Sequence, residues 1–132
     1  MTDMLTVARS ALERYHEVQA DDDGTLTFAH GDVMCAVQGN ELAEGLPVLN
    51  LFCVVAWDLP DDPDPARNVP MRVALGAGGG LFGRPEVKRT ELGWDVTLRY
   101  AFPAAGLDEK AMGTLLMLVV AGASSMRAEL VG

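Results

Sequence analysis

The sequence predicts an α+β fold: an N-terminal helix, a five-stranded and mainly antiparallel sheet (three strands, a crossover and a hairpin), and a C-terminal helix packed on the sheet. Three observations predict it. Apolar residues recur at helical spacing near both ends of the chain, residues 94–102 alternate between apolar and polar, and turn-forming residues separate the predicted strands. With 132 residues, of which 49% are hydrophobic, the chain can bury one proper core. We therefore expect a single domain over residues 1–132.

The first helix is predicted over residues 3–18. Thr2 or Asp3 can cap its start through a side-chain oxygen. Its apolar stripe is formed by Leu5, Ala8, Leu12 and Tyr15. Clustered aspartates and a glycine at residues 21–24 favour a turn after the helix. The aspartates could also suggest a calcium site, but the segment lacks the ligand order of a calcium-binding loop, so a solvated turn is favoured.

Three strands are predicted next, over residues 25–29, 32–38 and 47–57, with a loop at 40–45. The third strand is apolar on both faces, so we expect it to be central and covered on both sides at least in part. If the second and third strands pair around a turn near residue 44, Cys35 lies opposite Cys53. The two cysteines match no redox motif or metal-site spacing, so we expect buried thiols, and a disulfide only outside a reducing compartment.

An irregular crossover is predicted at residues 58–70, where prolines and acidic residues cluster. Asp64 can cap a short helix that starts at Pro65, and residues 71–75 fit either a strand or a helix. A second hairpin is expected from residues 81–90 and 94–102. The glycines at 78–83 match the GxGxxG pattern of dinucleotide-binding loops, but a strand follows instead of a helix, which favours a simple turn.

The last helix, which Asp108 can cap, is apolar almost all round. One seam with alternating spacings of four and three residues suits the core and consists of Met112, Leu116, Val119, Ala123, Met126 and Leu130. Residues off this seam also need cover, either from a sheet that curls around them or from a second molecule. We favour a second molecule, and the candidate partner-binding residues are Met117, Leu118, Ala121 and Ser125, together with Phe52 and Val54 of the third strand.

Charge is distributed unevenly along the chain, whose formal net charge is −9. Residues 1–66 contain two basic and thirteen acidic residues, whereas residues 67–132 contain eight basic and six acidic ones. This balance argues against nucleic acid and anionic membranes as partners. A candidate contact for an acidic partner, or simply the solvated face of a hairpin, consists of Arg84, Lys88, Arg89 and Arg99.

The sequence shows no pattern of catalytic, cofactor-binding or metal-ligating residues. The serines lie outside any nucleophile-elbow motif, and the two histidines, His16 and His30, share no metal-site spacing with the cysteines. The N-terminus lacks the features of a secretory signal, and the apolar run within residues 111–123 is shorter than the ~20 residues that span a bilayer. We therefore expect a non-enzymatic protein of the cytoplasm without cofactor or metal.

The order of the predicted elements resembles the YbjN-like family, which is similar to the type III secretion chaperone fold. Residues 48–52, 94–100 and 103–108 carry this resemblance. It implies a small α+β domain, commonly dimeric, that binds protein segments or regulates by interaction and has no established active site. Secretion chaperones of this fold bind extended stretches of effectors. Addition of a strand to a sheet edge, with apolar pockets for side chains, would be the binding mode.

Two function hypotheses follow. The first is a homodimeric, chaperone-like or regulatory module that binds a protein or peptide client through apolar helix and sheet surfaces. The second is a small-ligand sensor with a pocket between the sheet and the helices near Gly76 to Gly83. It is motivated by the glycine-rich turn and by Phe82 and Trp94 close to it in the sequence.

Overall fold

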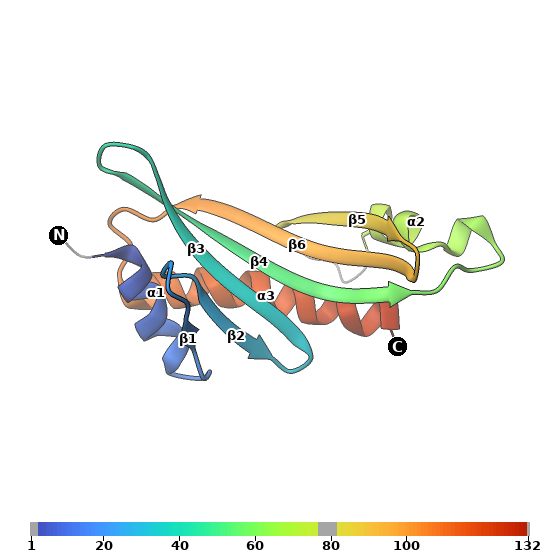
Figure 1. Cartoon of the computed structure of the whole chain (residues 1–132), viewed down its shortest axis with the longest axis horizontal. Coiled ribbons are helices and arrows are strands. Elements are labelled where there is room, and N and C mark those ends of the chain that lie inside the picture. The colour runs from blue at the N-terminus through green and yellow to red at the C-terminus, as the bar shows by residue number, and fades with distance from the viewer. Residues whose placement is uncertain (1–2, 77–81, 132) are drawn as a thin grey trace.

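The computed structural model describes residues 3–76 and 82–131, which form one antiparallel sheet packed against two long helices (Figure 1). The described helices are α1 (Met4–Glu13), the 3-10 turn η1 (Pro65–Arg67), α2 (Val69–Ala74) and α3 (Glu109–Val131). The described strands are β1 (Gln19–Ala20), β2 (Leu26–His30), β3 (Val33–Ala43), β4 (Leu46–Leu59), β5 (Arg84–Thr90) and β6 (Gly93–Pro103). The sheet order is β1-β2-β3-β4-β6-β5, so the predicted fold class is confirmed with six strands in place of five.

The sixth strand follows from a first helix that is shorter than predicted. α1 ends at Glu13, and in the turn that follows the carbonyl of Leu12 accepts hydrogen bonds from the N–H groups of both Tyr15 and His16. The chain then leaves the helix, and Tyr15 is 82% exposed instead of lying on the inner stripe. The released segment pairs Gln19 and Ala20 with β2. Both residues of β1 are exposed. The sequence of this strand therefore lacks the alternation of apolar and polar residues that would have predicted it.

The predicted register of the β3–β4 hairpin is confirmed, because Cys35 is paired with Cys53. Both strands are longer than expected, and most of the loop predicted at 40–45 is strand, with a tight turn before Leu46. β4 lies between β3 and β6, so its central position is also confirmed. Ladder pairing on both edges holds this strand over most of its length.

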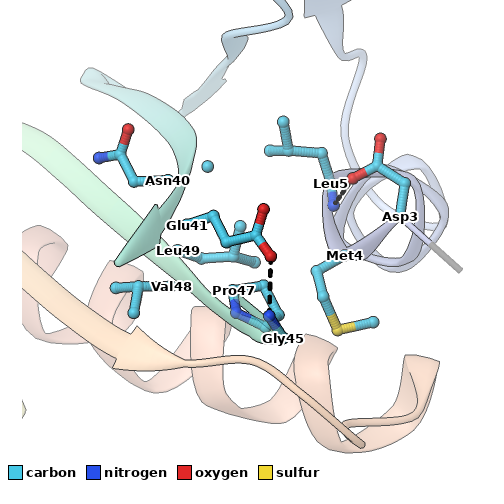
Figure 2. Close-up of a pocket in the computed structure, with 10 residues that line it drawn as sticks. Asp3, Met4, Leu5, Asn40, Glu41, Gly45, Pro47, Val48 and Leu49 are labelled. Carbon is cyan, nitrogen blue, oxygen red and sulfur yellow. Dashed lines mark hydrogen bonds between the residues drawn. The ribbon is translucent and has the colours of Figure 1, made fainter. Parts of the chain in front are cut away.

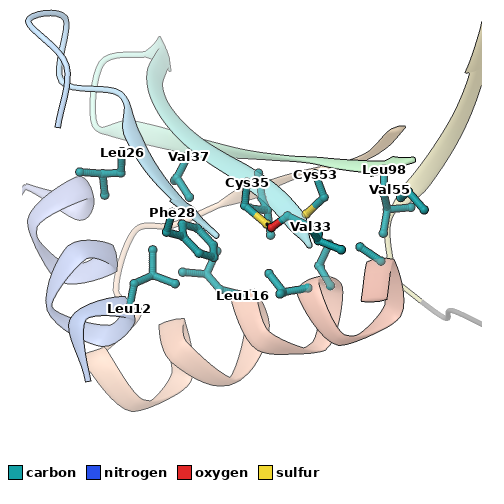
Figure 3. Packing of buried hydrophobic residues seen from close by; sticks show 14 of the residues in the cluster. Leu12, Leu26, Phe28, Val33, Cys35, Val37, Cys53, Val55, Leu98 and Leu116 are labelled. Carbon is teal, nitrogen blue, oxygen red and sulfur yellow. The ribbon is translucent and has the colours of Figure 1, made fainter. Parts of the chain in front are cut away.

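The hydrophobic core fills the space between the sheet and the two long helices (Figure 3). The inward residues of β4, Leu49, Leu51, Cys53 and Val55, are at most 1% exposed. All six residues of the predicted α3 seam are buried, which confirms that seam. The Asp108 carboxylate accepts the N–H of Ala111 at 2.7 Å and caps the helix as predicted.

The other face of the sheet is not covered by a helix in the described part of the chain. Phe52 and Val54 point to this side and are half-buried, and Met34 is 51% exposed. β4 is therefore covered by helices on one side only, and its outward residues have the partial cover that was expected as a minimum. Both long helices pack on the same side, and the six-residue α2 lies near β5 at the sheet edge (Figure 1).

The crossover is irregular, as predicted, with Asp64 capping η1 through a 3.0 Å bond from the N–H of Ala66. The segment that fitted strand or helix belongs largely to α2. Residues 78–81 of the GxGxxG match lie outside the described residues. Gly83 has a φ of +100°, and a Cβ there would lie 2.8 Å from Leu98 Cγ. This glycine therefore lets the edge strand β5 pack closely against β6.

α3 is longer than the apolar run suggested. Among the described helices it is long and apolar enough, by length and composition, to cross a membrane, which corrects the expectation based on residues 111–123. In the folded domain its seam is packed against the sheet.

Candidate protein-binding surfaces

The outer face of α3 is left uncovered by its own sheet. Leu118 is 45% exposed, Ala121 and Ser125 are exposed, and Met117 is half-buried against the core. Successive spacings of four and three residues place Thr114, Leu118, Ala121 and Ser125 on one stripe of the helix. We call this stripe the outer helix face.

A hollow of about 400 Å³ opens between the start of α1 and the β3–β4 hairpin (Figure 2). Its walls are Asp3, Met4, Leu5, Gly39, Asn40, Glu41, Gly45, Pro47, Val48 and Leu49. The hairpin turn is tied by a bond from the N–H of Gly45 to Glu41 Oε1 at 2.9 Å. Leu5 lies against Gly39, where an added Cβ would be 3.2 Å from the Leu5 side chain. This glycine therefore allows close contact between α1 and β3.

Two further hollows continue the first one. The second, of about 560 Å³, shares Met4, Gly45 and Pro47 with the first and reaches the β6–α3 loop. The third, of about 410 Å³, shares Asp108 with the second and ends at Leu118 on the outer helix face. The three hollows share lining residues, each with the next, and we call them together the end groove. Its half-buried apolar side chains are Met4, Leu5, Val7, Leu107 and Leu115.

The predicted partner-binding residues belong to two separate surfaces. Met117, Leu118, Ala121 and Ser125 lie on α3, which packs under the sheet. Phe52 and Val54 lie on the opposite side, because the adjacent β4 residues Leu51 and Cys53 point into the core. The structure therefore does not bring these two groups together.

The predicted basic cluster is also divided between the two sides of the sheet. Arg89 lies on the helix side of β5, bonded to Asp61, and its guanidinium is 5.0 Å from the Trp94 ring centroid. The Trp94 indole N–H also donates to Asp61, at 2.8 Å. The bond from Arg89 and then that from Trp94 lower the pKa of the Asp61 carboxyl.

The remaining cations, Arg84, Lys88 and Arg99, lie on the side of the sheet that no helix covers, which we call the open sheet face. In-register pairing with β6 places Arg84 opposite Arg99 and Lys88 opposite Asp95. Cross-strand partners share a face of the sheet. The open sheet face therefore carries three of the four predicted basic residues.

The structure brings together one pair of residues that sequence reasoning treated as separate. His16 Nε2 lies 3.0 Å from His30 Nδ1, and the His16 ring contacts Phe28 edge-on with centroids 5.2 Å apart. The contact links the end of α1 to β2. No sequence signal reveals it, because the path of the chain between the two histidines decides it.

The cysteine pair is suited to packing and not to nucleophilic chemistry. Cys35 and Cys53 are buried, and no disulfide joins them (Figure 3). The neighbouring Cys53 thiol and burial both raise the pKa of Cys35, so the thiol stays protonated. Across residues 3–76 and 82–131, no three metal-ligating side chains gather.

The pocket expected near Gly76 to Gly83 is small in the part that the structure describes. It has about 70 Å³ and is lined by residues that include Phe82, Leu98 and Met126. Small-molecule sites usually have about 300–1,000 Å³. Trp94, the other residue that motivated this pocket, does not line it.

Comparison with known proteins gives a similarity of fold but none of sequence family. No family model matches the chain, and no curated protein matches it. A chain of the solved HopA1–SchA chaperone–effector complex superposes with a TM-score of 0.53 at 14% sequence identity, covering 97% of this chain and 99% of that one. The similarity is to the type III secretion chaperone, SchA, and it shows a shared fold over nearly the full chain.

Proposed function

We propose that this chain is a non-enzymatic, chaperone-like module that holds an extended segment of a protein client in the end groove. The end groove is the observation that carries the proposal, because its hollows share lining residues, are mostly apolar and are formed by three segments far apart in the sequence. The shared fold with a chaperone whose structure was solved in a complex with its effector supports the same role.

The chemistry of the groove indicates the kind of segment that it fits. Its half-buried apolar side chains can remove a client's apolar groups from water, at about 25 cal/mol per Å² buried. Met4 is flexible and adapts to clients of different shape. Asp3, Glu41 and Asp108 add negative charge along the groove. The preferred segment therefore alternates apolar and basic residues.

A pull-down from lysate of the source organism tests the client site. Val7→Glu places a charge in the groove, and Leu92→Glu is the matched control, because Leu92 is 75% exposed in the β5–β6 turn. We expect proteins that the wild type and L92E recover but V7E does not. Recovery of the same proteins by V7E, with circular dichroism showing a folded variant, would contradict a client site in the end groove.

We propose further that the outer helix face forms a homodimer. Ala121 and Ser125 are small, so two such helices can approach closely around Leu118. The end groove meets this face at Leu118, so dimerisation would bring the grooves of two chains near each other.

Sedimentation equilibrium tests the dimer directly. We expect the wild type and L92E to be dimers at tens of micromolar, and Leu118→Glu to be a folded monomer. A wild-type monomer at that concentration would refute the dimer and leave the client site to be judged by the pull-down. We also place the protein in the cytoplasm, since adjacent free thiols persist in a reducing compartment.

A small-ligand sensor is the second candidate function. The hollow between α1 and the β3–β4 hairpin favours it, because its volume of about 400 Å³ suits a small molecule. Thermal-shift screening with nucleotides and metabolites tests this role, since a tight ligand stabilises the fold by RT ln(1 + [L]/Kd). A shift that a folded Leu5→Glu variant abolishes would favour the sensor over the client-binding role, because Leu5 lines this hollow.

A further inference from the structure

We infer that the open sheet face carries a second binding site, which recognises the carboxylate groups of an acidic peptide segment through Arg84 and Arg99. This site lies across the sheet from the end groove. It takes a ligand of opposite charge to the one that suits the groove, so either proposal can fail without the other.

A single row of side chains across the sheet builds the site. Ala36 pairs with Phe52, Phe52 with Arg99, and Arg99 with Arg84, so all four side chains lie on the open sheet face. Like charges directly opposite each other on neighbouring strands destabilise a sheet. The Arg84–Arg99 pair therefore has a cost in the free protein that a bound anion would remove.

Neither arginine is neutralised within the described part of the chain. The ion pairs there involve Arg9, Arg14, Arg67 and Arg89 and no residue of this row. Both guanidinium groups are exposed. They make a local positive charge on a protein whose net charge is −9.

The surface beside Arg99 is hollowed, with a volume of about 390 Å³. The hollow is lined by Ala36, Gln38, Asn40, Asn50, Phe52 and Arg99. The Arg99 guanidinium lies 5.3 Å from the centroid of the Phe52 ring, which limits its freedom before a ligand binds. The Asn50 side chain has no hydrogen-bond partner among the described residues, so its amide N–H groups are available. A guanidinium fork beside a free amide donor matches the two oxygens of a carboxylate.

The adjacent row is apolar on β3 and β4 and continues to Thr97 and Glu86 on β6 and β5. Met34 pairs with Val54 on the same face, two residues along each strand from Ala36 and Phe52. Side chains two apart in an extended peptide point the same way, about 6.6 Å from one another. An extended segment with an acidic residue and an aliphatic residue two positions apart therefore fits both rows at once.

A short acidic peptide fits this face better than a nucleic acid. Glu86 and Asp95 share the face with Arg84, Lys88 and Arg99, so few cations are left for a long polyanion. The acidic N-terminal half of the chain would repel the rest of such a ligand. A segment with one or two carboxylates needs only the Arg84–Arg99 pair.

Fluorescence anisotropy with a labelled peptide tests the site. The probe is fluorescein-Gly-Ser-Glu-Thr-Val-Thr-Glu-Ser-Gly, with a second peptide in which both glutamates are glutamines, at low ionic strength. We expect saturable binding of the first peptide and at least about tenfold weaker binding of the second, since a charge-assisted hydrogen bond contributes about 1.5–3 kcal/mol. Arg99→Gln and Arg84→Gln should each weaken binding about five- to tenfold.

Lys110→Gln is the matched control, because Lys110 is an exposed cation on α3, outside the open sheet face. It should change affinity by less than about twofold if recognition is local. Arg99→Lys keeps the charge but removes the fork, and should bind the peptide more weakly than the wild type. Urea denaturation verifies that each variant is folded, and Arg84→Gln serves alone if Arg99→Gln does not fold.

Four outcomes would overturn the inference. Equal binding of the glutamate and glutamine peptides would exclude carboxylate recognition. An equal loss in K110Q and R99Q would indicate attraction by overall charge. Competition by an oligothymidylate at stoichiometric concentration would indicate a nucleic-acid site. Dissociation of a dimer by R84Q or R99Q would show that a second copy of the chain occupies the face.

Discussion

The two faces of the sheet are made from the same strands but differ in how completely their side chains are buried and their charges are paired. On β4, the inward residues Leu51 and Cys53 have no exposed surface, whereas the outward residues Phe52 and Val54 between and beside them are only half-buried. Burial of the inward set closes the core. The apolar outward set is not needed for closure, and the second binding site proposed above includes part of it.

The arginines of β5 also differ between the two faces of the sheet. On the helix side of β5, Arg89 has Asp61 and the Trp94 ring as neighbours. On the open side of the same strand, Arg84 faces a second arginine, Arg99. The covered face therefore pairs its cation within the chain, whereas the open face keeps two neighbouring cations that no ion pair among the described residues neutralises.

The largest difference is expected from truncation of neighbouring residues on β4. Leu51→Ala should lower the free energy of unfolding by about 2–5 kcal/mol, because Leu51 is fully buried and the vacated space cannot collapse completely. Phe52→Ala should lower the free energy of unfolding by roughly 1 kcal/mol, because the Phe52 side chain is only half-buried in the folded protein. Urea denaturation followed by circular dichroism measures both. Equal losses would show that the open face is as well packed as the core.

A smaller loss of stability is expected from Val→Thr substitutions, which change the polarity of a side chain and keep its shape. Val37→Thr inserts a hydroxyl where the side chain is 0% exposed and should cost about 1–3 kcal/mol. Val54→Thr makes the same change on the open face and should stay within about 0.5 kcal/mol. Thermal unfolding of the two variants beside the wild type measures the contrast. A large loss at Val54 would indicate that this face is desolvated in the free protein.

The pH dependence of stability should report the ion pair on the covered side. The folded pKa of Asp61 is lowered by Arg89 and Trp94, so the carboxylate contributes stability above its ordinary pKa, and this is lost as the pH falls through the lowered one. Asp61→Asn should therefore be less stable than the wild type at neutral pH and lose less stability on acidification. Urea midpoints at several pH values measure the effect, with Asp22→Asn in the exposed turn as control.

The smallest effect is expected at Arg84, and its sign distinguishes the two faces. Arg84→Gln removes the like-charge contact with Arg99 and should leave stability unchanged or raise it slightly, by no more than about 0.5 kcal/mol. Arg89→Gln, five residues along the same strand, should lower stability because Asp61 loses its partner. Chemical denaturation at low salt shows both. A loss of stability in R84Q would mean that Arg84 has a stabilising contact within the fold.

Local patterns predicted most of the architecture. The α3 seam follows from helical spacing alone, and all six of its residues are buried. The opposition of Cys35 and Cys53 follows from a hairpin centred near residue 44, since one turn position fixes every pair along two strands. The caps at Asp64 and Asp108 follow from the residue types.

The surfaces were harder to predict, because they depend on which segments meet. The end groove combines the start of α1, a hairpin and the β6–α3 loop, and no single stretch of sequence carries a signal for it. The division of the basic cluster depends on strand alternation at Arg89, which turns one cation away from the others. The apolar pattern of β4 could not reveal that both long helices pack on one side.

Arg127 of α3 binds a backbone carbonyl of β4 just beyond the point where the pairing of β4 with β3 ends. The pairing of β3 with β4 ends at Met34 opposite Val54. The next carbonyl, that of Val55, accepts a 3.0 Å bond from Arg127 Nη1, whose guanidinium lies 5.4 Å from the Trp57 ring centroid. Unpaired strand edges template aggregation. Loss of this guanidinium would free a backbone acceptor beside an exposed tryptophan, so such a variant should lose solubility on concentration while its circular dichroism spectrum stays native.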